Sequence, residues 1–173
     1  MWSMRSVLIS KVAAALILSA TQAAALTCVP MGPGDVYQII AREEAAEYVV
    51  LEGRLSFDPT SLPQSGKSAP KKPQRISAHF TGLMLGERFF DQDVTGELLI
   101  ESHCEAGQCG ALQDGERYLL FARQEADALV LPLDPCVSFA FSAADGAAGD
   151  VILQCHKGLE CPSELPVPPV SFD

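Results

Sequence analysis

The sequence predicts a mainly β domain: five antiparallel strands and one short N-terminal helix, stapled by disulfides. Three observations predict it. Several segments alternate apolar and polar residues, glycine-containing turns separate them, and six cysteines stand behind an export signal. The clearest segment is a β-hairpin, in which the apolar runs Tyr118–Ala122 and Ala128–Leu133 flank the charged turn Arg123–Asp127.

Residues 1–25 have the three parts of a secretory signal peptide. A basic start is followed by the apolar stretch Val12–Ala20 and by small residues up to Ala25, after which cleavage is expected. The apolar stretch is shorter than the ~20 residues of a membrane span, so no transmembrane segment is expected. A lipid anchor on Cys28 is less favoured, because Thr27 stands where lipoprotein processing requires Gly or Ala. The sequence therefore predicts a periplasmic or secreted protein.

Composition limits the classes of partner. Cleavage would leave about 150 residues, which fits a single domain. The chain has 22 acidic and 12 basic residues and a net charge of −10, which argues against nucleic acid or anionic lipid as its main partner. It contains no asparagine and hence no N-glycosylation acceptor, which suits a bacterial exported protein. An even number of cysteines in such a protein is typical of disulfides.

The first elements follow the mature N-terminus. Asp35 is expected to cap a helix that runs to about Ala46. One face of this helix is apolar: Val36, Ile39 and Ile40. The period then changes to two over 47–57, which predicts a half-buried strand. Its inward set is Val49, Leu51, Gly53, Leu55 and Phe57. Residues 58–73 contain four prolines and three lysines, and a loop of this length is either flexible or functional.

Two more strands precede the hairpin. One spans about 74–85, and Gly82 and Gly86 predict a bend of the kind that closed sheets use. The other spans 93–102. Inward positions on these two strands are Ile76, Ala78, Phe80, Val94, Leu98 and Ile100. Beyond Cys136 the pattern loosens, residues 142–149 are interpreted as turns, and 162–173 as a proline-rich tail.

One helix and five strands with glycine bends describe an OB-type barrel. Several motifs are more specific: Cys-x-Pro at Cys28, A-E-Y-V-V-L-E-G-R-L from Ala46, Cys109-Gly110, G-E-R-Y-L-L-F-A from Gly115, and L-x-L-x-x-C ending at Cys136. Together they resemble the netrin-like module, which is the barrel of the tissue inhibitors of metalloproteinases. The similarity spans about Cys28 to Cys136, and we expect the domain itself to cover 26–161.

The resemblance implies a binding module that engages another extracytoplasmic protein, such as a protease. It implies that Cys28 pairs with Cys136, and that Cys28, Val29 and Pro30 contact the partner. The family opens with a Cys-x-Cys pair whose first cysteine is the mature terminus, whereas here one cysteine follows Leu26 and Thr27. The family partner of Cys109 is therefore missing, and Cys104 is the expected substitute.

Two clusters combine cysteine with histidine: His103-Cys104-x4-Cys109 and Cys155-His156-x4-Cys161. Such spacing suits zinc, but export favours the two small disulfides Cys104–Cys109 and Cys155–Cys161, so no metal or cofactor is expected. With all cysteines paired, none remains as a nucleophile. The carboxylate pairs Asp91/Asp93 and Glu97/Glu101 are better explained as part of the solvent-exposed face of the sheet than as acid–base groups.

Lys67, Lys71, Lys72 and Arg75 form the one basic cluster of an acidic chain. A solvated loop is the simpler interpretation, and a docking loop for an acidic partner is the functional one. Two classes of function remain. The first is a binding module without catalytic residues, and the second is an unrecognised extracytoplasmic enzyme, such as a hydrolase. A stoichiometric partner captured from periplasm or medium would favour the first, and turnover in a hydrolase panel the second.

Overall fold

The structure is a computed structural model that describes residues 28–163. The predicted signal peptide at 1–25 and most of the predicted tail at 162–173 lie outside these residues. Neither described helix has both the length and the apolarity that crossing a membrane requires.

Five strands form the closed OB-like barrel that the sequence predicts. They are β1 (Glu47–Phe57), β2 (Gln74–Leu85), β3 (Phe90–Ser102), β6 (Arg117–Glu125) and β7 (Ala128–Leu133). Their order is β1-β2-β3-β7-β6, and a β1–β6 pairing closes the ring. Four of these pairings are antiparallel, but β3 and β7 run parallel. An odd number of strands cannot alternate direction all the way round a ring, so one parallel pair is unavoidable.

Alternating side chains fill the barrel, as the period of two predicts. The largest fully buried members of this core are Leu51, Leu55, Phe80, Leu98, Ile100, Leu120 and Leu131. Gly53 and Gly82 lie directly opposite each other on β1 and β2. A Cβ on either glycine would collide with the backbone of the other strand. The two glycines therefore permit a close approach at which the sheet can bend.

Helix α1 (Pro33–Ile40) begins earlier and ends earlier than expected. Gly32 is its N-cap residue, and Asp35 is the third helical residue, whose carboxylate accepts a hydrogen bond of 3.0 Å from the Gly32 N–H. Pro33 at the first helical position sets this start. The apolar face is also narrower than predicted, because Val36 is fully buried whereas Ile39 is 48% exposed.

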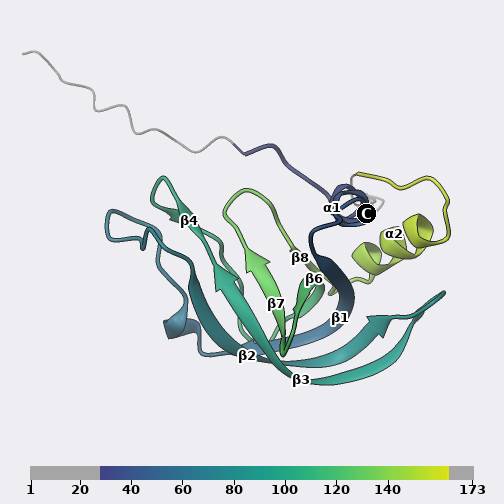
Figure 1. Cartoon of the computed structure of the whole chain (residues 1–173), viewed down its shortest axis with the longest axis horizontal. Helices are drawn as coiled ribbons and strands as arrows, with labels where there is room; N and C mark the ends of the chain where they lie inside the picture. The colour runs from purple at the N-terminus through teal and green to yellow at the C-terminus, as the bar shows by residue number, and fades with distance from the viewer. Residues whose placement is uncertain (1–27, 164–173) are drawn as a thin grey trace, which may run out of the picture.

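A second helix, α2 (Ala147–His156), corrects the interpretation of residues 142–149 as turns, because it begins at Ala147. It packs on the outside of β1 and β6 in a second apolar cluster. The buried members of this cluster are Val36, Val50, Leu119, Phe121, Ala148 and Ile152. Figure 1 shows α1 and α2 together on this side of the barrel. The short strand β8 (Ala140–Ser142) extends the sheet beside β6.

Three disulfides join the cysteines in the predicted pairs. Cys28–Cys136 has a sequence separation of 108, whereas Cys104–Cys109 and Cys155–Cys161 have separations of 5 and 6. The first ties the N-terminal segment to the residues just after β7, the second lies in a small hairpin, and the third joins the last turn of α2 to the segment that follows it. Gly34 of α1 fits closely against this third disulfide, because a Cβ there would meet Cys161 Sγ and the Pro162 carbonyl.

Candidate functional site

Several loops meet at one end of the barrel, and we call this surface the rim. It comprises residues 28–30, 58–73, 103–110 and 134–136. Figure 1 shows the β1–β2 loop, the hairpin that contains β4 and the loop after β7 projecting from this same end. Leu62 and Gly110 are the only buried residues of the rim, so contacts other than apolar burial must hold most of these loops in place.

The N-terminal segment is fixed to the rim covalently. Cys28 is half-buried and joined to Cys136, just beyond the last barrel strand. The next residue, Val29, is 77% exposed, and Pro30 is also exposed. Pro30 lines a hollow of about 480 Å³ that extends to Phe141. The disulfide thus holds an exposed apolar side chain at a defined place on the surface.

A small hairpin forms the centre of the rim. Its strands are β4 (Cys104–Glu105) and β5 (Gln108–Cys109), and the Cys104–Cys109 disulfide joins directly opposed residues. The turn between them has two consecutive positive φ angles, 49° at Ala106 and 80° at Gly107. At its base the His103 N–H donates a hydrogen bond of 2.8 Å to the Leu133 carbonyl. The hairpin is therefore anchored to β7.

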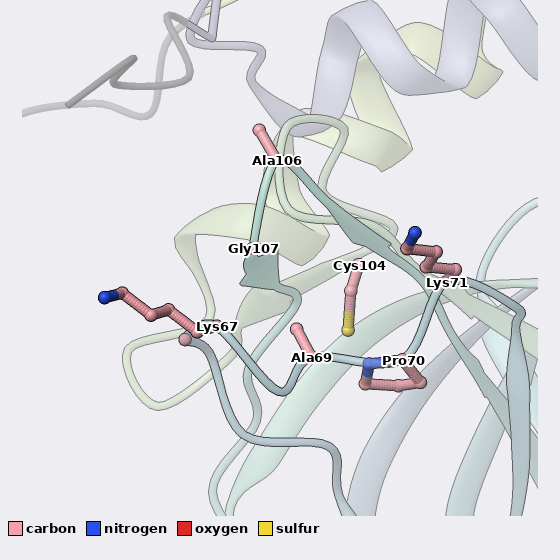
Figure 2. A pocket seen from close by; sticks show the side chains of 8 residues that line it. Lys67, Ala69, Pro70, Lys71, Cys104, Ala106 and Gly107 are labelled. Carbon is pink, nitrogen blue, oxygen red and sulfur yellow. The ribbon is translucent and has the colours of Figure 1, made fainter. Parts of the chain in front are cut away.

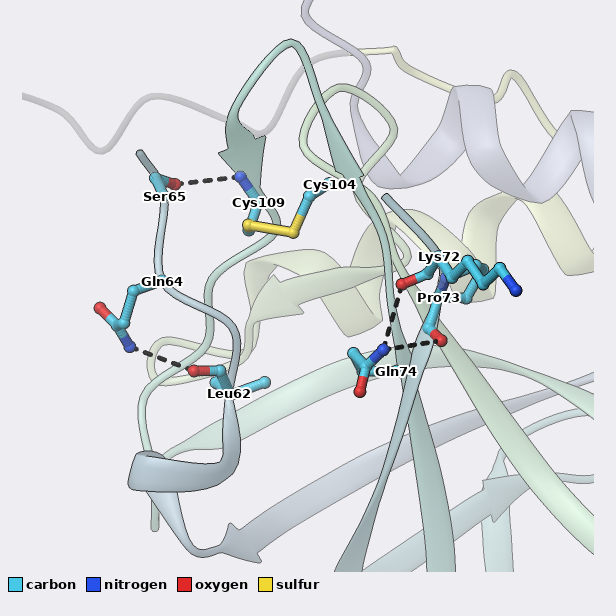
Figure 3. Close-up of a disulfide and its surroundings, with 8 residues drawn as sticks. All are labelled: Leu62, Gln64, Ser65, Lys72, Pro73, Gln74, Cys104 and Cys109. Carbon is cyan, nitrogen blue, oxygen red and sulfur yellow. Dashed lines mark hydrogen bonds between the residues drawn. A yellow bond between two sulfur atoms is a disulfide. The ribbon is translucent and has the colours of Figure 1, made fainter. Parts of the chain in front are cut away.

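The β1–β2 connection, residues 58–73, packs against this hairpin, and we call it the lysine loop. The Gly66 N–H donates to the Gly107 carbonyl at 2.7 Å, and the Cys109 N–H donates to Ser65 Oγ at 3.0 Å. Figure 3 shows Ser65 beside the disulfide. The sequence offers almost no apolar anchor in this loop, yet Leu62 is only 8% exposed and joins the barrel core.

The lysine loop begins with a short 3-10 helix, Pro59–Ser61. Asp58 caps it by accepting hydrogen bonds from the Thr60 hydroxyl, at 2.7 Å, and from the Thr60 N–H, at 2.9 Å. These hydrogen bonds to Thr60 lower the pKa of Asp58. The cap fixes the direction in which the chain leaves β1, and so places the rest of the loop over the hairpin.

A pocket of about 540 Å³ lies between the lysine loop and the hairpin. The lysine loop contributes Lys67, Pro70 and Lys71 to its lining, and the hairpin contributes Cys104 and Gly107. Figure 2 shows Lys67 and Lys71 on opposite sides of the pocket. All three lysines of the loop are exposed, and none takes part in an ion pair within residues 28–163. The pocket is therefore flanked by positive charge that is not paired within the described residues.

Arg75 differs from these lysines, although the sequence groups all four together. It donates to Glu101 at 2.8 Å and to both oxygens of Glu125, at 2.9 and 3.0 Å. Arg123 joins the same two carboxylates, at 3.2 and 2.8 Å. Partial burial raises the pKa of Glu101, but hydrogen bonds from Arg75, Arg123 and His103 outweigh it, so the pKa is lowered. The charge of Arg75 is therefore largely neutralised within the protein.

The two histidine–cysteine clusters are not arranged as metal sites. Cys104, Cys109, Cys155 and Cys161 are all in disulfides, and residues 28–163 contain no group of metal-binding side chains. His156 instead joins α1 to α2, because its Nδ1 lies 2.8 Å from the Tyr37 hydroxyl. Its Nε2 lies 3.0 Å from the Glu87 carbonyl. Burial raises the pKa of Tyr37.

Searches for similar proteins returned no family model, no curated protein and no solved structure that matches this chain.

Proposed function

We propose that this protein is an exported, disulfide-stabilised binding module of the netrin-like kind, whose rim engages another extracytoplasmic protein. The observation that carries the proposal is the covalent assembly of the rim. The Cys28–Cys136 disulfide places exposed Val29, and the Cys104–Cys109 hairpin holds the lysine loop at the same end of the barrel. Loops held on a rigid barrel are a common basis of recognition.

The charges of the rim indicate the chemistry of the partner. Lys67, Lys71 and Lys72 form no ion pair within residues 28–163, and the first two line a pocket, whereas Arg75 is paired within the sheet. An acidic segment of a partner would meet these lysines, and Val29 would add an apolar contact nearby. Opposite charge at the edge of an interface mainly raises the association rate and the specificity. A protease with an acidic surface is one class of partner that fits.

The first experiment locates the partner on the surface. Tagged mature protein carrying a photo-crosslinking residue at Val29 is exposed to the extracytoplasmic fraction, and the cross-linked proteins are identified. The matched control carries the same residue at Ile39, which is exposed on α1. We expect a stoichiometric partner with Val29 and none with Ile39. The same partner captured equally at both positions would contradict a rim interface.

The second experiment tests the lysines. K67E/K71E/K72E reverses three charges on the loop, and R42E/R88E/K157E reverses three exposed charges elsewhere. We expect the first variant to bind the captured partner about tenfold or more weakly and to associate more slowly, while the second binds like the wild type. An equal loss of affinity in both variants would show that the effect comes from the net charge of the protein and not from the lysine loop. Turnover in a hydrolase panel without any partner would favour an enzyme instead.

A further inference from the structure

The strand β3 has a neighbour along only one edge for much of its length. β2 pairs with it from Phe90 to Ser102, but β7 joins the other edge only from Leu99 onward. Within residues 28–163 no strand covers that edge between Phe90 and Leu98. Backbone N–H and C=O groups of alternate residues therefore face outward, which is a template for the addition of another strand.

This edge is already in the conformation that an added strand requires. β2 fixes its register through pairs such as Thr81↔Thr95 and Gly82↔Val94. Asp93, Thr95 and Glu97 are exposed on the outer face of the sheet, and a Cβ on Gly96 would meet no atom within 4 Å. Because the backbone is held in place, a partner strand would lose its own conformational freedom without reordering this one.

The charged side chains along the edge favour an added strand of opposite charge. Asp93 and Glu97 lie on the same face with Thr95 between them. The one described ionisable neighbour of Glu97 is His79, 3.7 Å away, and both side chains remain more than half exposed. Opposite charges on directly paired strands stabilise the pairing, and like charges oppose it. An extended segment with basic residues four positions apart would place one opposite each carboxylate.

A second copy of this chain fits the edge poorly. In an antiparallel pairing centred on Thr95, Asp93 of one copy would lie opposite Glu97 of the other, and both ends of the seam would repel. The overall acidity of the chain adds to this repulsion.

We infer that the free edge of β3 between Gln92 and Leu98 is a docking site for an extended basic segment of another protein, which binds by strand addition. Backbone hydrogen bonds would provide the register, and Lys or Arg side chains four residues apart would pair with Asp93 and Glu97. The inference does not depend on the rim, because it rests on a different surface and different residues.

The test uses three synthetic peptides and the mature protein. In the first peptide, valines alternate with lysine, threonine and lysine in that order, so that the two lysines are four residues apart. The second peptide has glutamate in place of both lysines. The third is the lysine peptide with N-methyl groups on alternate backbone amides. Fluorescence anisotropy measures binding, and amide hydrogen exchange locates it. We expect the lysine peptide to bind about tenfold or more tightly than the glutamate peptide. We also expect slower exchange within 92–98, and loss of binding on N-methylation.

Charge-reversed protein gives a second, independent readout. D93K/E97K should prefer the glutamate peptide, and the near-isosteric variant D93N/E97Q, which keeps the shape of the edge, should lose the preference without reversing it. Binding of the N-methylated peptide as tightly as its parent would overturn strand addition. So would the absence of any binding, protection elsewhere in the chain, or a concentration-dependent dimer protected at 92–98. If no peptide binds and no dimer forms, the role left for these charges is to keep the edge from pairing.

Discussion

On the helical side of the barrel, buried apolar side chains hold the elements together, whereas at the rim disulfides and backbone hydrogen bonds do so. Helix α2 contributes the fully buried Ala148 and Ile152 to the cluster over β1 and β6. The lysine loop contributes one buried apolar residue, Leu62, and is otherwise attached through the hairpin at Cys104–Cys109. The rim therefore depends more on cross-links and hydrogen bonds than on buried apolar residues.

The largest expected effect is the loss of the long-range cross-link. In C28S/C136S the free energy of unfolding should fall by about 4–5 kcal/mol, because the disulfide closes most of the domain into one loop in the unfolded chain. Denaturant unfolding of the variant and the wild type measures this change. A loss no larger than that caused by removing a short-loop disulfide would show that the chain-entropy account fails here.

On the helical side, Ile152→Ala should lower the free energy of unfolding by about 2–5 kcal/mol, because Ile152 is fully buried between α2 and the sheet. Ile39→Ala is the matched control, since the same side chain is 48% exposed on α1. The control should change stability by less than about 0.5 kcal/mol. Similar losses in both variants would mean that α2 does not pack as described.

The existence of α2 also shows where sequence patterns stop being informative. Its residues Ala147–Gly149 favour a turn when considered alone, and glycine inside a helix is unfavourable. In the tertiary structure Gly149 packs against β1, where a Cβ would displace the Glu52 carboxylate that pairs with Arg117. That contact involves residues far apart in the chain, so no local pattern reveals it.

The barrel strands were predictable for the opposite reason. Their inward residues alternate strictly, as Ile76, Ala78 and Phe80 do, and all three are buried. At the rim, the basic residues were visible but their environments were not. Arg75 is paired across strands with Glu101 and Glu125, whereas Lys67 lines the pocket and has no ion-pair partner within residues 28–163. The difference between Arg75 and Lys67 depends on which residues of β2, β3 and β6 the strand register brings together.

Removing the rim disulfide should have a smaller global effect and a clear local one. C104S/C109S is expected to lower stability by about 2 kcal/mol on the chain-entropy model. It should also speed tryptic cleavage at Lys67, Lys71 and Lys72, because the lysine loop is bonded to that hairpin. C155S/C161S is the matched control, because it removes a disulfide that closes a loop of similar length on the helical side. If both variants are cleaved equally in the lysine loop, the hairpin does not hold it.

The ion-pair network should produce a modest pH dependence. The pKa of Glu101 is lowered from 4.5, so its stabilising contribution is complete above that unfolded-state value and is lost as the pH falls through the folded-state pKa. E101Q should therefore flatten the dependence of unfolding free energy on pH below 4.5. Glu97→Gln removes the same charge from the same strand and serves as the control. If the pH dependence of the unfolding free energy flattens equally in both variants, the effect comes from net charge and not from the ion pairs of Glu101.

The smallest expected effect concerns zinc proteases, and it follows from the structural role of Cys28. In the tissue inhibitors of metalloproteinases, the family expected from the sequence motifs, the free amine and the carbonyl of an N-terminal cysteine chelate the zinc of the target. Cleavage after Ala25 would leave Leu26 and Thr27 before Cys28, whose nitrogen is then a peptide N–H without a lone pair to donate. We therefore expect no inhibition of a zinc protease panel by this route. N-terminal sequencing of the exported protein tests the premise, and inhibition assays test the consequence.

A mature terminus at Cys28 together with nanomolar inhibition would give the rim a chelating role in addition to a structural one, and would contradict the prediction. A terminus at Leu26 without inhibition would leave side chains, Val29 and the lysines first among them, as the groups that contact a partner.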